Sequence, residues 1–262
     1  MTEPTLTPEA GPVPAEPRFT PLRGIHESLG AAFTDFGGWQ MPVRYASDLA
    51  EHHAVRQAAG LFDISHMAEF LVTGPGAGEF LDYALAGCLS TMAVGKAKYS
   101  LLLDDDGGII DDVIVYCLGA DWFLVIANAG NREAVAEAFA ARAPRAPIAA
   151  SFHGAPTEGV HTFGLVAGAD VARIEDVSDA CSLIAVQGPR AREIVAATAG
   201  VDTSGLDELG YYAALQSTFD GEPLLIARTG YTGEDGYELL VGNARAAEPW
   251  EALTVAGEPL GL

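Results

Sequence analysis

The sequence has very few lysines and no long apolar run. Only Lys96 and Lys98 are lysines among 14 basic residues, and 36 acidic residues bring the formal net charge to −22. A surface of this charge repels phosphate backbones, so no nucleic-acid partner is expected. No stretch of 18 apolar residues is present, and the amino terminus lacks the basic and apolar regions of a secretory signal. We therefore expect no membrane contact.

Cysteine is also scarce, and several common motifs are missing. Cys88, Cys117 and Cys181 form no CxxC pair, which is typical of reduced thiols in a cytoplasmic protein. The absence of GxGxxG, GxxxxGK[ST] and GxSxG excludes the usual dinucleotide, P-loop and hydrolase sites. The adjacent His52 and His53 lie on a predicted helix and point about 100° apart, so no shared metal is expected.

The most informative stretch is YSLLLDDDGGIIDDVIVY, residues 99–116. Its apolar and β-branched residues predict two strands, 99–103 and 109–116, and the DDDGG between them supplies the residues of a tight turn. The second strand contains two neighbouring acids, Asp111 and Asp112. The stretch therefore predicts a β-hairpin with carboxylates inside an otherwise apolar strand.

The two carboxylates are expected on opposite faces of that strand, because side chains alternate along a strand. Asp112 shares its face with Ile110, Ile114 and Tyr116, and Asp111 takes the other face. An unpaired charge in apolar surroundings costs several kcal/mol, which favours a functional site. The alternative is that one acid faces solvent at a strand edge and the other pairs with an arginine.

The remaining pattern predicts an α+β fold, mainly antiparallel sheets with flanking helices, because hairpins interrupt the alternation of strands and helices. Residues 1–20 are rich in proline and predict a disordered tail, and residues 143–179 predict a long connection. Helices are predicted over residues 48–59 with Ser47 as the cap, 76–86, 132–142 and 189–200, and after Asn243. Further strands are predicted at 32–40, 61–73 with a break at 65–66, 122–127, 181–186, 216–219, 224–227 and 237–241.

A second informative stretch is ARTGYTGEDGYELL, residues 227–240. Its three glycines predict a compact loop that presents Tyr231, Glu234 and Asp235 around one point. A carboxylate on such a loop suits a planar heterocycle with adjacent N–H groups, which would donate two parallel hydrogen bonds. The alternative is a surface turn whose acids are solvated.

Six motifs, in order and at similar spacing, resemble the glycine cleavage system T-protein, the tetrahydrofolate-dependent aminomethyltransferase. They are WQMPV (39–43), EHHAVR (51–56), LFDISHM (61–67), GGIIDD (107–112), VQGP (186–189) and TGYTGEDG (229–236). The related folate proteins of iron–sulfur assembly carry a cysteine-bearing KGCYxGQE loop. The TGYTGEDG of this chain favours the T-protein branch.

The resemblance implies that an aminomethyl group on the lipoyl arm of the H-protein is passed to tetrahydrofolate, with release of ammonia. The family's key aspartate maps to Asp112, with Asp111 as the fallback, and would orient the folate and stabilise positive charge. Glu234 matches the glutamate that binds the pterin edge. Three residues are implied as walls of the pocket: Tyr99, Asn128 and Tyr231.

The sequence departs from the family at its end. Family members continue through a GARD-containing segment into a C-terminal barrel domain, whereas the T-protein-like region here covers residues 21–262 and this barrel is absent. Two alternatives are the folate domain of a dimethylglycine or sarcosine oxidase-like system, without a flavin-binding segment, and a non-catalytic folate-binding module. Lys96, Lys98 and Arg132 are the predicted contacts for an acidic carrier protein.

Overall fold

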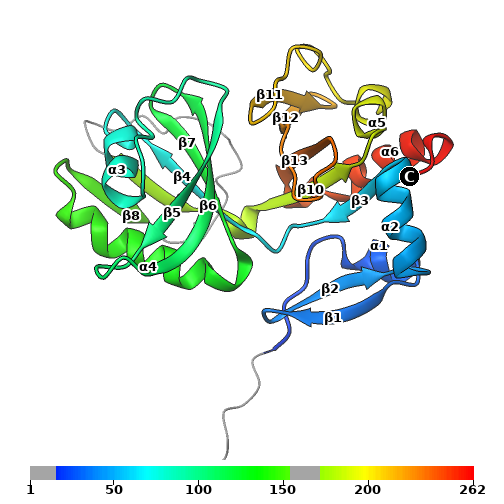
Figure 1. Ribbon diagram of the computed structural model, residues 1–262, viewed down its shortest axis with the longest axis horizontal. Coiled ribbons are helices and arrows are strands. Elements are labelled where there is room, and N and C mark those ends of the chain that lie inside the picture. The colour runs from blue at the N-terminus through cyan, green and yellow to red at the C-terminus, as the bar shows by residue number, and fades with distance from the viewer. Residues whose placement is uncertain (1–15, 154–171) are drawn as a thin grey trace, which may run out of the picture.

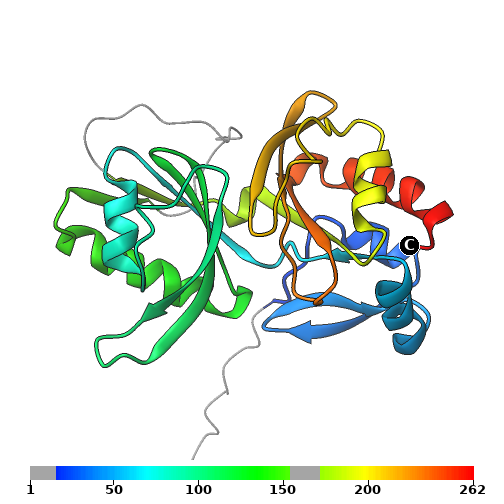
Figure 2. The ribbon, with the colours of Figure 1, turned by 45° about the horizontal axis from the view of Figure 1, so that its top comes forward.

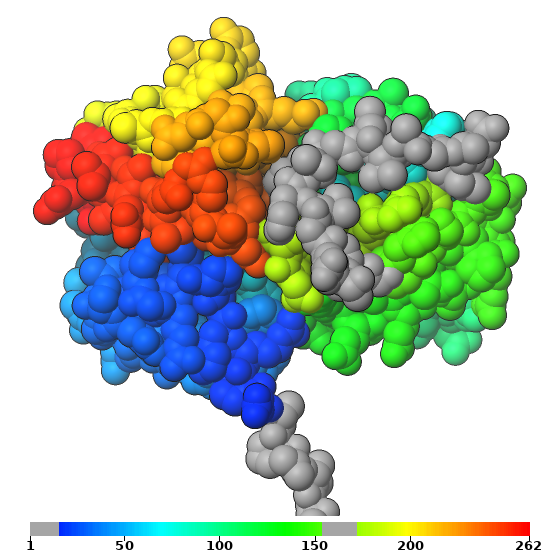
Figure 3. Space-filling model, turned by 180° about the vertical axis from the view of Figure 1, so that it is seen from behind, coloured from blue at the N-terminus to red at the C-terminus, as the bar shows by residue number. Residues whose placement is uncertain are grey.

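The computed structural model describes residues 16–153 and 172–262, which form a two-stranded hairpin and two larger β-sheets that pack against each other. Figures 1 and 2 show the sheets side by side, with helices on the outer side of each. Seen from behind, the amino-terminal residues lie beneath the carboxy-terminal ones, on the same half of the molecule (Figure 3). The predicted α+β class is confirmed. Within the described residues, no helix is long and apolar enough to cross a membrane.

The first sheet has six strands in the order β5-β6-β7-β4-β9-β8, all antiparallel except the β8–β9 pair. Helices α3 (Ala77–Ala84) and α4 (Arg132–Arg142) cover its outer face. The strands are β4 (Ala68–Thr73), β5 (Ala97–Leu103), β6 (Ile109–Gly119), β7 (Trp122–Ala127), β8 (Ala150–His153) and β9 (Ala172–Asp176).

The second sheet has five antiparallel strands in the order β11-β12-β13-β10-β3. Helices α5 (Ala191–Ala197) and α6 (Ala247–Gly257) pack on its outer face. The strands are β3 (Gly60–Asp63), β10 (Cys181–Gln187), β11 (Ala214–Phe219), β12 (Glu222–Ala227) and β13 (Gly236–Gly242). The amino-terminal part adds α1 (Arg23–Ser28), the hairpin β1 (Ala32–Phe36) and β2 (Trp39–Arg44), and α2 (Asp48–Gln57).

The two larger sheets and the helices on the outer face of each form four layers. Three apolar cores hold these layers together. One core lies between the six-stranded sheet and α3 and α4, and another between the five-stranded sheet and α5 and α6. The third lies between the sheets and joins side chains of both, including Tyr116 and Leu124 from one and Leu183 and Leu240 from the other. Because the third core is buried between two strand faces, both sheets are apolar on both sides.

Most local elements occur where the sequence predicts them. The acidic hairpin β5–β6 and the hairpin β11–β12 are present, and β7 and α4 have the predicted bounds. Ser47 caps α2, because its Oγ accepts a hydrogen bond from the Ala50 N–H at 3.4 Å. The break predicted near residues 65–66 is the point at which the chain leaves the five-stranded sheet after β3 and enters the six-stranded sheet with β4.

Other expectations are wrong. The connection predicted over 143–179 contains two strands, β8 and β9. Strand β9 pairs with β4, which lies far away in the sequence, and β8 pairs with β9. Residues 154–171 lie outside the described part. Asn243 does not cap α6, because its Oδ1 accepts from Ser182 Oγ at 2.7 Å and its Nδ2 donates to the Asp179 carbonyl. Pro249 lies in the first turn of α6 and does not break the helix.

The disordered tail predicted over residues 1–20 includes residues that belong to the packed fold. The Arg18 N–H donates to the Gly38 carbonyl at 2.9 Å, and Thr20 is buried and donates to Asp63 at 2.5 Å. Residues 1–15 of the predicted tail lie outside the described residues. The packed chain thus begins before the expected residue 21.

Glu69 on β4 is an acid buried without a hydrogen-bond partner for its carboxylate. Its side chain is 0% exposed, and neither oxygen has a partner among the described residues. Burial raises the pKa of Glu69 well above its ordinary value, and the nearby charge of Asp176 raises it further, while Arg132 opposes the shift. The folded protein therefore favours the neutral form of Glu69 more strongly than the unfolded chain does.

This raised pKa predicts a loss of stability at high pH. The folded protein holds the Glu69 proton more tightly than the unfolded chain, so the stabilisation is complete below pH 4.5 and is lost as pH rises toward the folded pKa. Glu69→Gln should remove this dependence, which amounts to about 1.4 kcal/mol per pKa unit. Urea unfolding at pH 6 and pH 8 measures it, with the exposed Glu79→Gln as control. An equal loss of stability in wild type and Glu69→Gln would contradict the assignment.

Candidate functional site

Strand β6 distributes its side chains between two cores, as its sequence predicts. Ile114 and Tyr116 face the core between the sheets, whereas Val113 and Val115 face the core under α3 and α4. Asp112 and Asp111 continue these two faces in the predicted way. Ile110 departs from the prediction and packs on the helix side, because the pairing of β5 and β6 shifts register between Leu102 and Leu103.

Asp111 is the buried acid of the pair and anchors the loop after β7. It is 2% exposed, and its oxygens accept from the Asn128 N–H at 2.9 Å, from Asn128 Nδ2 at 2.9 Å and from Asn131 Nδ2 at 2.6 Å. Amide groups therefore compensate its burial, in place of the arginine that the alternative interpretation required. With all these contacts internal, Asp111 is a structural residue that fixes the start of α4.

Asp112 is exposed and remains available for a ligand. Its Oδ1 receives one hydrogen bond, from Asn128 Nδ2 at 3.1 Å, and the same amide group also reaches the Asp112 carbonyl. Asn128 thus bridges both acids and orients Asp112 without covering it. This difference supports the choice of Asp112 over Asp111 as the chemically active carboxylate.

Tyr99 on β5 lies near Asp112 and near a second acid, Glu238 on β13. Burial raises the pKa of Tyr99, and the negative charge of Glu238, the phenol of Tyr212, the charge of Asp112 and the phenol of Tyr231 add to the shift. The Tyr99 and Tyr212 rings meet edge to face at 6.0 Å. These side chains come from β5, β6 and β13 and from the loops before β11 and β13, so tyrosines and acids from both sheets gather around Tyr99.

The sequence interpretation missed Glu238. Its Oε2 accepts from Thr229 Oγ1 at 2.5 Å and from the hydroxyl of buried Tyr116 at 3.3 Å. Burial raises the pKa of Glu238, while these two hydrogen bonds oppose the shift. A signal was present, because Glu238 stands between two apolar residues of β13, Tyr237 and Leu239, that face the core on the other side.

The acids of the glycine-rich loop do not converge on one point. Glu234 forms an ion pair with Arg56 of α2 at 2.9 Å, and Asp235 is held by Arg228 through two hydrogen bonds. Tyr231 is 96% exposed at the tip of the loop. The structure thus places Glu234 against α2, and Glu238 takes the position beside Tyr99.

Gln187 explains two of the three loop glycines. It is 2% exposed, its Nε2 donates to the Thr229 carbonyl at 3.2 Å, and its Oε1 accepts from Thr232 Oγ1 at 3.0 Å. A Cβ on Gly230 or Gly236 would lie 2.1 or 2.2 Å from Gln187 Oε1. Glycine is therefore required there for close approach to a buried amide.

The predicted basic contacts differ in availability. Arg132 is committed to Asp176 at 2.8 Å and to Asp179 at 2.6 Å, and its side chain is only 13% exposed. Lys96 and Lys98 are exposed. Within residues 16–153 and 172–262, no three His, Cys, Asp or Glu side chains group to hold a metal ion.

Comparison with solved structures places the fold in a class. Aminomethyltransferase T of the glycine cleavage system from Bartonella henselae matches with a TM-score of 0.72 and 34% identity, over 90% of this chain and 57% of that one. A chain of the heterotetrameric sarcosine oxidase from Corynebacterium sp. U-96 matches at 0.56 and 16% identity, over 94% and 97%, which is a likeness of fold alone. The fold is therefore that of the aminomethyltransferase T of the glycine cleavage system.

The family model of the GCVT N-terminal domain matches residues 22–262. Aminomethyltransferases from Cutibacterium acnes and Streptomyces avermitilis are each 48% identical over 94% of this chain, which covers 62% and 59% of their lengths. The chain belongs to the glycine cleavage T-protein family, as its motifs predict. It spans about three fifths of the length of these curated relatives.

The different roles of the two aspartates predict different costs of substitution. Asp111→Ala should destabilise the fold by about 2 kcal/mol or more, because it leaves buried amide donors of Asn128 and Asn131 without an acceptor. Asp112→Ala, on the exposed face, should change stability by less than about 0.5 kcal/mol. Urea denaturation of both variants measures the difference. Equal costs would show that Asp111 does not anchor the loop.

The packing around Gln187 predicts a second pair of substitutions. Gly236→Ala should cost about 1–3 kcal/mol, because the new methyl overlaps Gln187 Oε1. Gly242→Ala, at the other end of β13, has open space around its Cβ and serves as the matched control. Thermal unfolding should show a lower Tm only for Gly236→Ala. Adding Gln187→Ala should recover part of the loss, and an unchanged loss in the double variant would refute the overlap.

Proposed function

We propose that this protein binds tetrahydrofolate in the cleft between its sheets and takes part in aminomethyl transfer. The reaction breaks the C–N and C–S bonds of an aminomethyl-lipoyl carrier, the H-protein, and forms two C–N bonds to the folate. The two folate N–H protons leave with ammonia and the freed thiol, which balances the reaction. The observation that carries the proposal is that Asp112 and Glu238 both act on Tyr99 and raise its pKa. The relatives of this chain are named aminomethyltransferase.

The residues of the cleft fit a reduced pterin. Tyr99 and Tyr212 offer aromatic faces and edges for a flat ring, and the carboxyl of Glu238 suits its adjacent N–H groups. We assign to Glu238 the pterin contact that the motif comparison gives to Glu234, since Glu234 is already paired with Arg56. Tyr231 and Asn128 complete the set, Tyr231 as a wall and Asn128 by orienting the acids.

Asp112 is the proposed catalytic residue. Its exposed carboxylate, held by one amide hydrogen bond, would orient the folate nitrogen and stabilise positive charge as the methylene unit is transferred. In this transfer the protein positions the folate and the one-carbon unit and places charge beside them. It therefore needs to supply no redox chemistry. Lys96 and Lys98, which are exposed, are the proposed contacts for the carrier. The free thiols fit the reducing environment of the cytoplasm.

A non-catalytic folate-binding module is the second candidate. The two candidates share the cleft and differ in turnover. Binding and turnover are therefore measured separately.

Folate binding should depend on Glu238. Calorimetry with 5-formyl-tetrahydrofolate should show at least tenfold weaker binding for Glu238→Gln, because charge-assisted hydrogen bonds contribute about 1.5–3 kcal/mol. Glu234→Gln, in the loop that leads into β13, is the matched control and should bind like wild type. Wild-type affinity in Glu238→Gln, or an equal loss in Glu234→Gln, would refute the assignment.

Turnover should depend on Asp112. With an H-protein carrying aminomethyl-lipoate, tetrahydrofolate-dependent ammonia release should fall by about 10² or more in Asp112→Asn, while folate affinity changes much less. Asp112→Asn keeps the shape of the side chain and removes only its charge. Unchanged release in Asp112→Asn would exclude the carboxylate from the chemistry. Folate binding without any release by wild type would favour the non-catalytic module.

A further inference from the structure

Glu238, the proposed pterin contact, is held from both sheets through one of its two carboxylate oxygens. Its Oε2 accepts from Thr229 Oγ1 at 2.5 Å and from the Tyr116 hydroxyl at 3.3 Å. From the described residues, no hydrogen bond reaches Oε1. A carboxylate oxygen has two lone pairs, so Oε2 is occupied from within the protein and Oε1 is left for a ligand.

The free oxygen is accessible, whereas the two hydroxyls are not. Glu238 is partly exposed, and its Oε1 is not one of the sealed polar atoms that lack a partner. Thr229 is 3% exposed and Tyr116 1%. The hydroxyls of Thr229 and Tyr116 therefore act on a ligand through Glu238 and not by contact.

The proton of each hydroxyl sets the direction of these hydrogen bonds. A carboxylate only accepts, so Thr229 donates its single hydroxyl proton to Oε2. The Tyr116 proton is then shared between Oε2 and Thr229 Oγ1, which lies 3.1 Å from the Tyr116 oxygen. Short hydrogen bonds to a charged acceptor are the stronger ones. Thr229 thus holds the carboxylate, and Tyr116 supports both partners.

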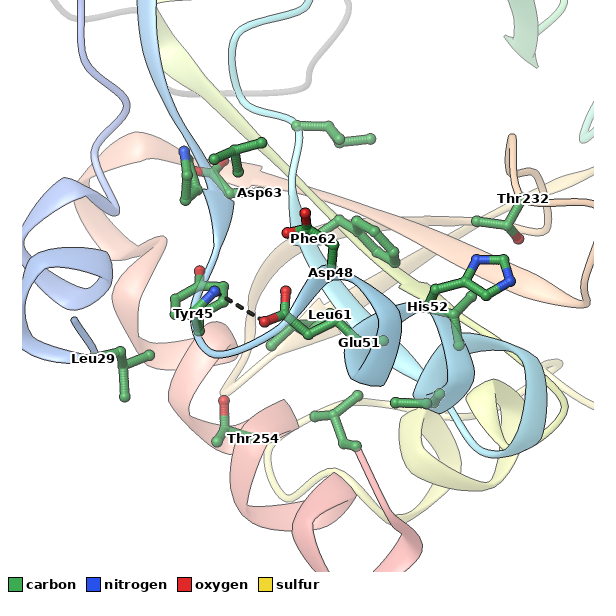
Figure 4. A pocket seen from close by; sticks show the side chains of 18 of the residues that line it. Leu29, Tyr45, Asp48, Glu51, His52, Leu61, Phe62, Asp63, Thr232 and Thr254 are labelled. Carbon is green, nitrogen blue, oxygen red and sulfur yellow. Dashed lines mark hydrogen bonds between the residues drawn. The ribbon is translucent and has the colours of Figure 1, made fainter. Parts of the chain in front are cut away.

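Thr229 is itself fixed by Gln187. Gln187 Nε2 donates to the Thr229 carbonyl at 3.2 Å, and Gln187 Oε1 accepts from Thr232 Oγ1 at 3.0 Å. Thr232 lies on the same loop (Figure 4). One buried amide therefore holds the loop between β12 and β13 at two points, which keeps the Thr229 hydroxyl beside Glu238.

We propose that Thr229 and Tyr116 are positioning residues for ligand recognition. They fix Oε2 of Glu238 so that Oε1 is presented to the N–H groups of the pterin. This inference rests on the proposed folate site and adds how the acid of that site is oriented and kept charged.

The same two hydrogen bonds favour the charged form of Glu238. Burial raises the pKa of Glu238, while the hydroxyls of Thr229 and Tyr116 oppose the shift. No cation of the described residues contributes to the pKa of Glu238 or of Tyr99. Loss of a hydroxyl should therefore keep the Glu238 carboxyl protonated to a higher pH. The other titratable groups in these surroundings are phenols and one acid: Tyr99 of β5, Asp112 of β6, and Tyr212 and Tyr231 of the loops before β11 and β13.

The pH dependence of folate binding tests the proposal. Calorimetry with 5-formyl-tetrahydrofolate between about pH 5 and pH 9 should show weaker binding at the acid end, where Glu238 takes up a proton, and Glu238→Gln should lack this change. In Thr229→Val, the midpoint of the change should rise by about one pH unit, which corresponds to the loss of one charge-assisted hydrogen bond. Thr229→Ser keeps the hydroxyl and should keep the wild-type midpoint. Titration of the ligand itself is common to all variants and cancels.

Tyr237→Phe is the matched control for Tyr116→Phe. Tyr237 precedes Glu238 on β13 and packs on the other side of the sheet, and its buried hydroxyl has no hydrogen-bond partner among the described residues. Tyr116→Phe should raise the midpoint by less than Thr229→Val does, because its hydrogen bond to Oε2 is longer. Tyr237→Phe should leave the midpoint unchanged.

Two results would overturn the proposal. An unchanged midpoint in Thr229→Val would show that its hydroxyl does not act on Glu238, and an equal loss of affinity at every pH would give Thr229 a structural role alone. If wild type binds no folate, the proposed function fails separately. Carbon-13 NMR of glutamate-labelled protein then follows the Glu238 carboxyl without ligand, its signal being the one lost in Glu238→Gln. A higher pKa in Thr229→Val would support the positioning role, and an unchanged pKa would refute it.

Discussion

The packing of the two sheets face to face determines the rest of this structure. Tyr116 shows why, because its ring is buried in the core between the sheets while its hydroxyl reaches Thr229 and Glu238 on the other sheet. Asp112 lies on the same strand, β6, four residues before Tyr116 and on the same face of the sheet. Because the Tyr116 ring is fixed in this core, Asp112 of one sheet and Glu238 of the other lie near the same place. The rigid core sets the distance between these two acids.

That arrangement also explains the division of work between neighbouring acids. Asp111 points to the helix side, where the amides of Asn128 and Asn131 compensate its charge. Asp112 points to the cleft and receives a single hydrogen bond. Burial without compensation would be costly for either acid, so the alternation of β6 leaves only one carboxylate free for chemistry. A structural acid beside a reactive one is thus a product of strand geometry.

The sequence predicted what depends on neighbouring residues and missed what depends on sheet packing. The hairpin β5–β6, the Ser47 cap and α4 follow from local patterns, and the six motifs identified the family. Glu238 could not be placed beside Tyr99, because their strands belong to different sheets and lie far apart in the chain. Strand β9 pairs with β4, which lies similarly far away in the sequence. Asn243 does not cap α6, because its side chain accepts a hydrogen bond from Ser182 instead. In each case a distant partner overrode the local signal.

Tyr231 lies near Tyr99 although its own side chain is almost fully exposed. Its phenol is close enough to Tyr99 to contribute to the raised pKa of that residue. A side chain that is 96% exposed loses considerable rotamer freedom when a ligand packs against it, and this loss weakens binding.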